Sequence, residues 1–415
     1  MKILFIGTTD NLGGAAIVGW EIGNSLMEKG HEVNYLVDIK TVSNKRIHLL
    51  RTQLPLDSTI RKFTGRSIRQ WLSYLRIYPA VDNMNTGSIK KIIQNPLVKE
   101  ADIIHCHNLH GGYFNLNSLI QISQEKPVIW TLHDMWAFTG GCFHSFSCER
   151  WRKKCGHCPN LKTFQSTDID NTSSILSKKK MIYKKTKLNI VAPSNWLYKK
   201  LDRSIMKSQH KHVIYNGIDT DVFKPGKQNS FRKKLKLPLN KKIILFVAYG
   251  GKNNPFKGGK YLDHLVKEYK SRSDIIFLCI GQEENPAPSE KNIIYLPYIS
   301  DKKVLSSYFS ASDVFLFTSL AENCPLVVIE ALSSGIPILS FDVGGVREIV
   351  EHKKNGYIVK YKNKKDLKRG FEWILNLSSE KIKKIKKQNR EKAIKDFLIK
   401  TMVDQYLKLY KQLLK

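Results

Sequence analysis

The chain has 415 residues, of which 42% are hydrophobic, and its formal net charge is +33. This length predicts two or three domains, and the composition excludes an intrinsically disordered protein. Apolar runs stay well below the roughly 18 residues that span a bilayer. The apolar start stops at Thr8, which is typical of a first strand and not of a secretory signal. We therefore expect a cytoplasmic protein whose seven cysteines are reduced unless a metal holds some of them.

The basic residues are unevenly distributed along the chain. Residues 151–250 contain 23 Lys and Arg against 5 Asp and Glu. Either these lysines only cover solvated faces, or they attract anions such as membrane headgroups and polyphosphate-linked substrates. Zinc-finger spacing, RNP-type aromatic motifs and a basic leucine zipper are lacking, so nucleic acid is the weaker candidate. An anionic membrane surface, bound peripherally at its inner face, is the partner that we expect.

Apolar strands and helical patterns alternate along the first half of the chain. Residues 2–7 form an apolar run that ends in glycine, as expected of a strand buried on both faces. An amphipathic helix is predicted over 15–30. Further strands are predicted at 31–37, 101–107, 127–133 and 189–194. This order is typical of a parallel sheet built from β-α-β units.

A second alternation begins after the turn-rich stretch 216–226. Its strands are predicted at 241–248, 273–281, 292–297, 313–319 and 336–342. Two such units predict an α/β protein of two Rossmann-like, doubly wound domains, residues 1–215 and 216–396. The Lys-rich stretch 377–395 has a helical pattern. The last helix, within 397–415, is expected to pack back on the first domain, with a membrane-surface helix as the alternative.

Two glutamates follow a strand in the second half. Glu322 comes after the predicted strand at 313–319, and Glu330 lies eight positions later. Pro325 suits the first position of a helix that ends at Gly335. Glu322 is therefore expected in the loop before this helix, and Glu330 near its second turn. An acidic residue that merely complements the helix dipole is the structural alternative.

The start of this helix also predicts an anion site. The N–H groups of Leu326 and Val327 have no partners inside the helix, so they can bind a diphosphate. The flanking carboxylates can accept hydrogen bonds from sugar or ribose hydroxyls. The position at the carboxyl end of a strand, followed by glycine-rich turns, strengthens this prediction.

The E-x7-E element of Glu322 and Glu330 resembles that of the retaining GT-B glycosyltransferases of family 4. The resemblance covers nearly the whole chain, and further segments carry it: YNGIDTDVFKP (215–225), Lys257-Gly258, YISDKKVLSSYFSASDVFLFTS (298–319) and DVGGVREIV (342–350). It implies a GT-B fold whose first domain binds the acceptor and whose second binds a nucleotide diphospho-sugar, with the reaction in the cleft between them. It also implies front-face, retaining transfer without a catalytic metal. A Cys-rich segment narrows the resemblance to enzymes of bacterial surface polysaccharides, whose acceptors are lipid-linked oligosaccharides.

The resemblance also implies residue roles in the second domain. Glu330 would hold the ribose hydroxyls, Glu322 the transferred sugar, and Lys257 the charge of the departing diphosphate. The other donor-binding residues implied are Asn323, Leu326, Val327 and Lys252. The family usually has an arginine about six residues before the lysine, whereas this chain has Gly251 there. Either Lys252 takes that role or the phosphate clamp is weaker, since lysine lacks the arginine fork.

The first domain carries two weaker motifs. Gly13 and Gly14 lead from the first strand into a helix and permit a close approach to phosphate, although a plain turn has the same pattern. In the family a glycine pair here faces the donor diphosphate. His133 ends a predicted strand, and the family's histidine at such a strand end touches the donor sugar near the reacting carbon. We therefore count His133 with Lys257 and Glu322 as candidate catalytic residues.

Four cysteines cluster at 142–158. Cys142, Cys148, Cys155 and Cys158 have the spacing C-x5-C-x6-C-x2-C. Four thiolates can hold one structural zinc, and reduced, packed thiols are the alternative. A thiol nucleophile is disfavoured because no His–carboxylate relay is evident.

Two other features point to different functions. The sequences 168–170 and 219–221 match a D-x-D metal motif of another glycosyltransferase fold, but neither follows an apolar strand, so we interpret them as turn or cap residues. The rival functions are a sugar-nucleotide epimerase on the same architecture and a basic binding protein without catalysis. Intact Glu322, Glu330 and Lys257 argue against the second.

Overall fold

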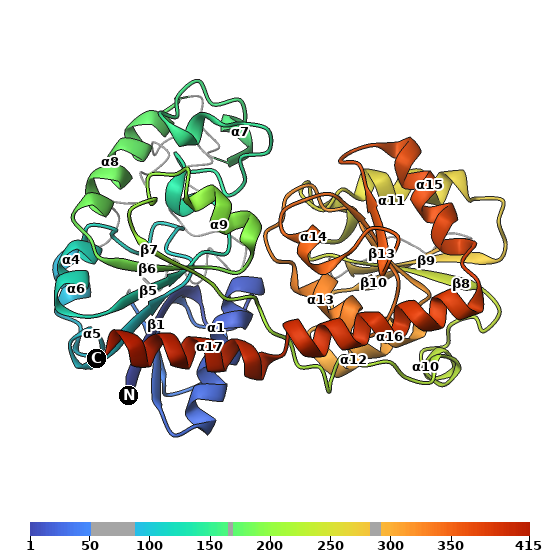
Figure 1. The fold of residues 1–415 in the computed structure, drawn as a ribbon, viewed down its shortest axis with the longest axis horizontal. Helices are drawn as coiled ribbons and strands as arrows, with labels where there is room; N and C mark the ends of the chain where they lie inside the picture. The colour runs from blue at the N-terminus through green and yellow to red at the C-terminus, as the bar shows by residue number, and fades with distance from the viewer. Residues whose placement is uncertain (51–87, 165–168, 283–291) are drawn as a thin grey trace. The chain divides into compact units, whose positions relative to one another are not determined.

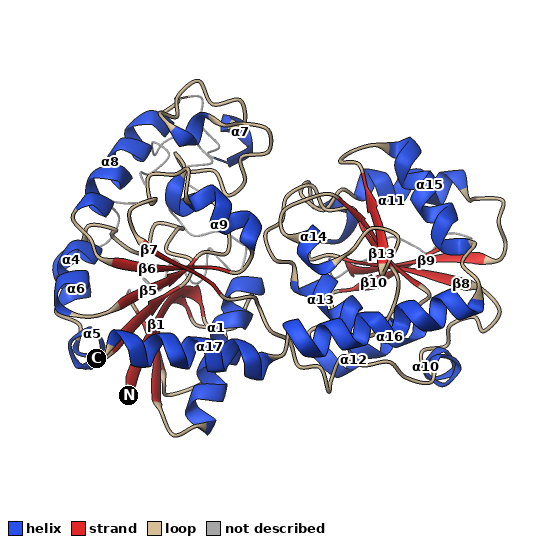
Figure 2. Cartoon of the chain, in the orientation of Figure 1, coloured by secondary structure: helices blue, strands red, loops and turns tan. Residues whose placement is uncertain are grey.

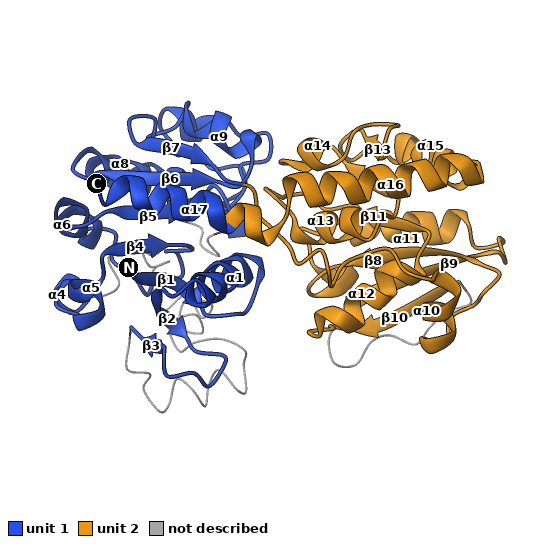
Figure 3. Ribbon diagram, turned by 60° about the horizontal axis from the view of Figure 1, so that its bottom comes forward, with its two compact units in different colours: residues 1–214, 403–415 blue, residues 215–402 orange. Residues whose placement is uncertain are grey.

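The computed structural model describes residues 1–50, 88–164, 169–282 and 292–415, in which the chain forms two compact units (Figure 1). Unit 1 consists of residues 1–214 and 403–415, and unit 2 of residues 215–402 (Figure 3). Each unit contains one parallel sheet with helices around it (Figure 2). This confirms the predicted α/β class with two successive Rossmann-like halves.

Unit 1 has a seven-stranded sheet in the order β3-β2-β1-β4-β5-β6-β7, and all its neighbouring strands are parallel. The strands are β1 Lys2–Thr9, β2 Glu32–Ile39, β3 Ile47–Leu49, β4 Ile103–Cys106, β5 Val128–Thr131, β6 Leu188–Ala192 and β7 His210–Val213. The helices are α1 Gly14–Glu28, α4 Ile89–Ile93, α5 Pro96–Glu100, α6 Ser118–Glu125, α7 Leu161–Phe164, α8 Thr172–Lys184 and α9 Asn195–Leu201, with short 3-10 turns η1 Trp136–Phe138 and η2 Arg150–Arg152.

Unit 2 has a six-stranded parallel sheet in the order β10-β9-β8-β11-β12-β13. Its strands are β8 Lys242–Val247, β9 Ile275–Gln282, β10 Ile293–Pro297, β11 Val314–Phe317, β12 Ile338–Phe341 and β13 Gly356–Val359. Its helices are α10 Gln228–Lys234, η3 Gly251–Asn253, α11 Gly259–Glu268, α12 Lys302–Ala311, α13 Leu326–Ser333, α14 Val346–Ile349, α15 Lys364–Leu375 and α16 Ser379–Asp396. Two apolar clusters form its core.

Helix α17, Ile399–Leu413, ends the chain and belongs mostly to unit 1. Its apolar residues Met402, Val403, Tyr406, Leu409 and Tyr410 are buried. The tyrosine hydroxyls are bonded: that of Tyr406 lies 2.9 Å from Thr131 Oγ1, and that of Tyr410 lies 2.7 Å from His105 Nδ1. Because these partners lie on β5 and β4, the apolar face of α17 is a core face and not a membrane-binding one.

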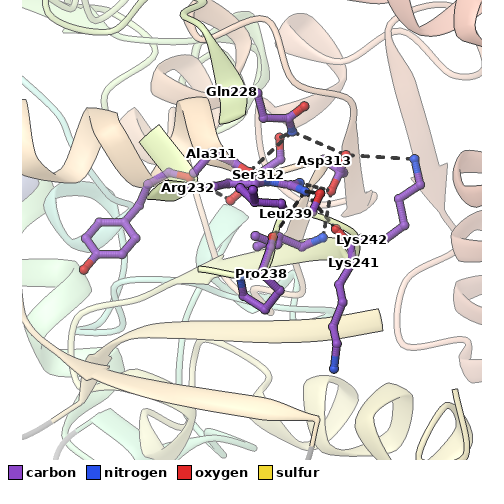
Figure 4. Close-up of polar contacts among 11 residues, drawn as sticks. Gln228, Arg232, Pro238, Leu239, Lys241, Lys242, Ala311, Ser312 and Asp313 are labelled. Atoms are coloured by element: carbon purple, nitrogen blue, oxygen red, sulfur yellow. Dashed lines mark hydrogen bonds and ion pairs between the residues drawn. The ribbon is translucent and has the colours of Figure 1, made fainter. Parts of the chain in front are cut away.

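A buried guanidinium joins three segments of unit 2 (Figure 4). Arg232 on α10 is 4% exposed and donates to Asp313 Oδ2 at 2.6 Å, in the turn before β11. It also donates to the carbonyls of Ala311 at 2.9 Å and Lys241 at 2.9 Å. Asp313 in turn accepts from the N–H of Ile243 at 2.7 Å, which fixes the start of β8 beside β11. Breaking such a buried pair by removing one partner typically costs about 3–5 kcal/mol, so this contact secures the two strands that carry the candidate site.

Candidate functional site

The two glutamates of the E-x7-E element lie where the sequence predicts, with one correction. Glu322 is in the loop after β11, and Glu330 is on α13. Pro325 is the residue preceding the helix and not its first helical residue, because its ψ of 118° is extended. The helix therefore begins at Leu326, and no side chain caps it, so the N–H groups of Leu326 and Val327 lie in an uncapped first turn.

Lys257 and Glu322 form an ion pair. The ammonium nitrogen lies 2.6 Å from Oε1, and the two side chains are 27% and 12% exposed. The next residue, Gly258, has φ +67°, and a Cβ there would lie 2.0 Å from the Thr318 carbonyl oxygen. Only glycine permits so close an approach, which brings the loop after β8 against the end of β11. The pairing therefore depends on the Lys-Gly dipeptide that the sequence singled out.

A second glycine shapes the other side of the Glu322 loop. Gly344 follows β12 with φ +57°, and a Cβ there would lie 2.1 Å from the carbonyl oxygen of Glu322. The adjoining N–H of Gly345 donates to the carbonyl of Asn323 at 2.7 Å, and the side chain of Asn323 is buried. The loops after β11 and β12 thus hold each other, and Glu322 is fixed at the strand ends.

Glu330 is an unusual carboxylate. Its Oε2 is buried and has no hydrogen-bond partner within the described residues. Burial raises the pKa of Glu330 to about 7, and the charge of Lys302 opposes this rise only in part. A buried acceptor without a donor costs about 1–3 kcal/mol. This group is therefore suited to receive hydroxyl donors from a ligand.

The structure explains why this chain has Gly251 where the family usually has an arginine. Gly251 has φ +58°, and a Cβ there would lie 2.5 Å from the Gln282 side chain, which is itself buried. Gln282 thus occupies the space that a longer side chain would need. The neighbouring Lys252 bonds with Asp263 Oδ1 and the Tyr295 hydroxyl, both at 3.0 Å. A role of Lys252 as a phosphate clamp would require it to give up or share these contacts.

Two exposed tyrosines were missed by sequence reasoning. Tyr249 follows β8 and Tyr298 follows β10, and their ring centroids are 5.5 Å apart in an edge-on arrangement. They are 64% and 48% exposed. The pKa of Tyr298 is raised, first by burial and also by the charges of Tyr249 and Glu330, so the pair lies near that carboxylate. An exposed aromatic pair offers a stacking face for a planar ligand group.

In unit 1 the glycine pair forms the turn into α1. Gly13 has φ +90° and precedes the helix, and Gly14 is its first residue. The first turn has no side-chain cap and no acidic residue. A positive φ favours glycine, so the turn itself explains Gly13, while the uncapped N–H groups leave an anion-binding end.

His133 follows β5 and bonds to another histidine. Its Nε2 lies 2.8 Å from Nδ1 of His107, which follows β4. Burial lowers the pKa of His133 to about 4, against an opposing effect of the Asp134 charge, and lowers that of His107 as well. Both rings are therefore neutral near pH 7. The sequence analysis missed His107, although a histidine at the end of the neighbouring strand was the available signal.

The D-x-D pairs lie at turns. Asp219 accepts the N–H groups of Asp221 and Val222, and Asp170 accepts those of Cys158 and Thr172. Asp168 lies outside the described residues. These side chains are bonded to nearby backbone, as expected of turn and cap residues.

The four cysteines line one cavity of about 20 Å³ in unit 1, together with Trp151, Leu161 and Phe164 among others. This volume accommodates one water-sized atom. Burial raises the pKa of Cys142 to about 12 and of Cys155 to about 11, while the ammonium of Lys179 opposes the rise at both. In the described parts of the chain, no three His, Cys, Asp or Glu side chains are grouped so that they could hold a metal ion. Four thiols around a small cavity suit a zinc ion, but the positions of the side chains do not form a metal-binding group. Bound zinc therefore stays a prediction.

The comparisons with known proteins identify the family. Residues 12–222 match the model described as Glycosyltransferase Family 4, and residues 227–392 match that of Glycosyl transferases group 1. The chain belongs to glycosyltransferase family 4. In the part of the chain that the structure describes, no helix has the length and apolarity needed to cross a membrane.

Individual relatives are distant. The chain is 26% identical over 265 residues to the putative colanic acid biosynthesis glycosyl transferase WcaC of Escherichia coli K12, covering 60% of this chain and 62% of that protein. It is 24% identical over 212 residues to the UDP-Gal:alpha-D-GlcNAc-diphosphoundecaprenol alpha-1,3-galactosyltransferase of Escherichia coli, covering 48% and 53%. The matches thus span less than two thirds of either relative. Anabaena Alr3699/HepE, solved with UDP, is similar over 100% of both chains with a TM-score of 0.68 and 16% identity, which confirms the GT-B fold.

The cysteine cavity generates a prediction about metal content. Protein purified without added metal is expected to contain about one zinc per chain, because a cation stabilises buried thiolates. Replacing Cys155 and Cys158 by serine should remove the metal and lower the melting temperature. Cys324→Ser, at a buried cysteine of unit 2, is the control that should leave the metal content unchanged. Elemental analysis that finds almost no zinc in well-folded protein would contradict the prediction.

Proposed function

We propose that this chain transfers a sugar from a nucleotide diphospho-sugar to a lipid-linked saccharide in the synthesis of a bacterial surface polysaccharide, with retention of configuration. Unit 2 binds the donor and unit 1 the acceptor. The observation that carries the proposal is Glu330, whose buried Oε2 has no hydrogen-bond partner in the described residues and can accept from hydroxyl donors. The ribose of a nucleotide supplies two adjacent hydroxyls. The galactosyltransferase relative, named for a diphosphoundecaprenol-linked acceptor, supports the acceptor class.

Other residues of unit 2 bind different parts of the donor. The uncapped first turn of α13 and Lys257 bind the diphosphate, and Glu322 binds the hydroxyls of the sugar while it orients the Lys257 ammonium at 2.6 Å. Tyr249 and Tyr298 offer a face for the base. Solved complexes of the HepE relative contain UDP and UDP-glucose, which supports this class of donor.

The chemical step exchanges one bond at the anomeric carbon. The bond from that carbon to the donor phosphate breaks, a bond to the acceptor hydroxyl oxygen forms on the same face, and the hydroxyl proton passes to the departing phosphate. Negative charge grows on the phosphate as it leaves, and in this proposal Lys257 and the first turn of α13 stabilise it. His133 of unit 1 contacts the donor sugar near the reacting carbon.

Glu330 gives a pH dependence that tests the ribose assignment. Ribose hydroxyls favour the ionised carboxylate, so donor binding should expel the proton that Glu330 holds below pH 7. Affinity for UDP-glucose, or for whichever GDP- or dTDP-sugar binds best, should rise about tenfold from pH 6 to pH 8. Glu330→Gln should remove this slope and weaken binding at pH 8 by about 1.5–3 kcal/mol.

The control for this experiment is Tyr298→Ala. Because this substitution removes a stacking face and no titrating carboxylate, the affinity of Tyr298→Ala for the donor should fall by a similar factor at every pH. Isothermal titration calorimetry at each pH measures all three proteins. If Glu330→Gln bound the donor with the same affinity as the wild type at every pH, the ribose role would be refuted.

Lys257→Ala tests the phosphate assignment. Single-turnover transfer with saturating donor should slow by about 10²–10³, because one preorganised partner of the developing charge is lost. Lys267→Ala, an exposed lysine near the end of α11, should transfer at the wild-type rate. Melting curves check that both variants are folded. A wild-type rate for Lys257→Ala would move the clamp to Lys252 or to Gly13 and Gly14, and conversion of the nucleotide-sugar without acceptor would favour an epimerase.

We further propose that unit 1 binds the inner face of the membrane through α8 and the residues after it. Exposed Lys180, Lys184, Lys185 and Lys187 accompany Met181, which is 59% exposed. Each lysine near an anionic surface contributes about 1 kcal/mol. Replacing Lys180, Lys184 and Lys185 by glutamine should therefore reduce sedimentation with vesicles that contain phosphatidylglycerol.

The matched control replaces three exposed lysines of α16 in unit 2: Lys381, Lys383 and Lys384. This variant loses the same charge and should sediment like the wild type. Equal sedimentation of the wild type with phosphatidylglycerol and with neutral phosphatidylcholine vesicles at low salt would refute membrane binding. If both triple variants lost sedimentation to the same extent, net charge, and not the lysines at α8, would be responsible for vesicle binding.

A further inference from the structure

Two buried histidines of unit 1 lie close together but differ in their bonding. His105 on β4 uses both ring nitrogens: Nδ1 lies 2.7 Å from the Tyr410 hydroxyl, and Nε2 lies 2.8 Å from Thr131 Oγ1. His107, two residues later, lies 2.8 Å from His133 Nε2 through its Nδ1. Its own Nε2 is buried and has no hydrogen-bond partner in the described residues.

Helix α1 explains why the Nε2 of His107 has no partner. A Cβ on Gly19 would lie 3.2 Å from this nitrogen and 3.4 Å from the neighbouring Cε1. The backbone of α1 therefore closes the site at contact distance, and only a glycine fits there without displacing the ring. Phe5 stacks near the same ring at a centroid distance of 5.6 Å. The nitrogen lies in an apolar, sealed environment.

This environment decides which nitrogen of His107 carries its hydrogen. A neutral imidazole has one N–H donor and one acceptor nitrogen. If the hydrogen were on Nε2, an N–H group would be buried without an acceptor, and orphaned N–H groups are rare in proteins. With the hydrogen on Nδ1, that hydrogen is donated to His133, and only a lone pair is left against Gly19. The second arrangement is the favourable one.

We propose that His107 is a positioning residue that donates its Nδ1–H to Nε2 of His133 and thereby places the hydrogen of His133 on Nδ1. The Nε2 lone pair of His133 is then occupied, and its Nδ1 carries a hydrogen. Neither nitrogen of His133 can accept a proton from an acceptor hydroxyl. In the transfer reaction, on which this consequence rests, His133 acts as a neutral hydrogen-bond donor and not as the base.

The surroundings keep His133 neutral. The groups near it include His107 on one side and, on its own loop and the loop after β4, Asp134 and His110, whose Oδ2 and Nε2 are 3.3 Å apart. Burial lowers the pKa of both His107 and His133, and the carboxylate of Asp134 only partly offsets this at His133. A neutral histidine pair has one shared hydrogen between the rings, which His107 can donate to His133.

The hydrogen positions can be measured without any assay of transfer. In the full chain labelled with 15N-histidine, long-range correlations between ring nitrogens and ring carbon-bound hydrogens distinguish the two neutral tautomers. We expect both His107 and His133 to carry hydrogen on Nδ1 at pH 7. The variants His107→Asn and His133→Asn assign the signals by loss. Hydrogen on Nε2 of His133, or a doubly protonated ring, would overturn the proposal even if assays confirm the proposed sugar transfer.

Kinetics test the positioning role. His107→Leu removes the donor, and transfer at saturating donor should fall about tenfold or more while KM for the donor changes little. His107→Asn keeps an N–H near the position of Nδ1 and should restore most of kcat and the Nδ1-hydrogen form of His133. Equal impairment of the two variants, with an unchanged His133 tautomer in both, would overturn the role.

The matched control is His105→Asn. His105 is also buried, on the strand that His107 follows, and its ring centroid is 4.5 Å from that of His107, but its ring nitrogens bond to Tyr410 and Thr131. This substitution should lower the melting temperature and leave the tautomer of His133 as in the wild type. A tautomer change in His105→Asn as large as that in His107→Leu would show general loosening of the strand ends and contradict a specific role of His107.

Discussion

Both sheets reverse their winding direction at one place, and four of the candidate residues lie at these two reversals. In unit 1 the reversal lies between β1 and β4, and in unit 2 between β8 and β11. At such a point the connections on either side run in opposite directions, which leaves the carboxyl ends of the two strands open to a ligand. Gly13 and His107 follow β1 and β4, and Lys257 and Glu322 follow β8 and β11.

The buried polar groups of the two units differ in how fully they are bonded. Arg232 and Asp313 are bonded on several sides, as are the nitrogens of His105, because a buried polar group that serves the fold must be satisfied. Glu330 has a buried oxygen without a hydrogen-bond partner among the described residues, and burial raises its pKa to about 7. This cost disappears when a bound ligand donates to the oxygen, which makes Glu330 a candidate for ligand contact.

The sequence predicted the fold better than it predicted the contacts. The long apolar runs became strands within a few residues of their predicted ends, because strands buried on both faces need continuous apolar sequence. The missed strands are short edge strands: β3, β7 and β13 have three or four residues each, and β7 reads HKHV. β3 and β7 contain polar residues, and β13, GYIV, is apolar and buried but only four residues long, so none of them forms a long apolar run in the sequence.

Some site residues could also be predicted from the sequence, and others could not. Glu322, Glu330 and Lys257 were found because they belong to a motif with fixed spacing. Gln282 in the space beside Gly251, the partner Asp263 of Lys252, and the tyrosine pair were not found, because each contact joins different segments that no motif spacing links. A single sequence shows which residues a strand end carries, but not which side chain from another loop fills the space beside them.

The histidines of unit 1 show how a core can set the chemistry of a strand end. The Tyr406 and Tyr410 hydroxyls of α17 bond to Thr131 and His105, which lie within β5 and β4. His107 comes two residues after His105, beyond the end of β4, and His133 comes two residues after Thr131, beyond the end of β5. The ring centroids of His105 and His107 are 4.5 Å apart, so the ring that Tyr410 anchors in the core packs against one member of the bonded pair. His105 therefore links the side chains that α17 contributes to the core of unit 1 with the bonded histidine pair.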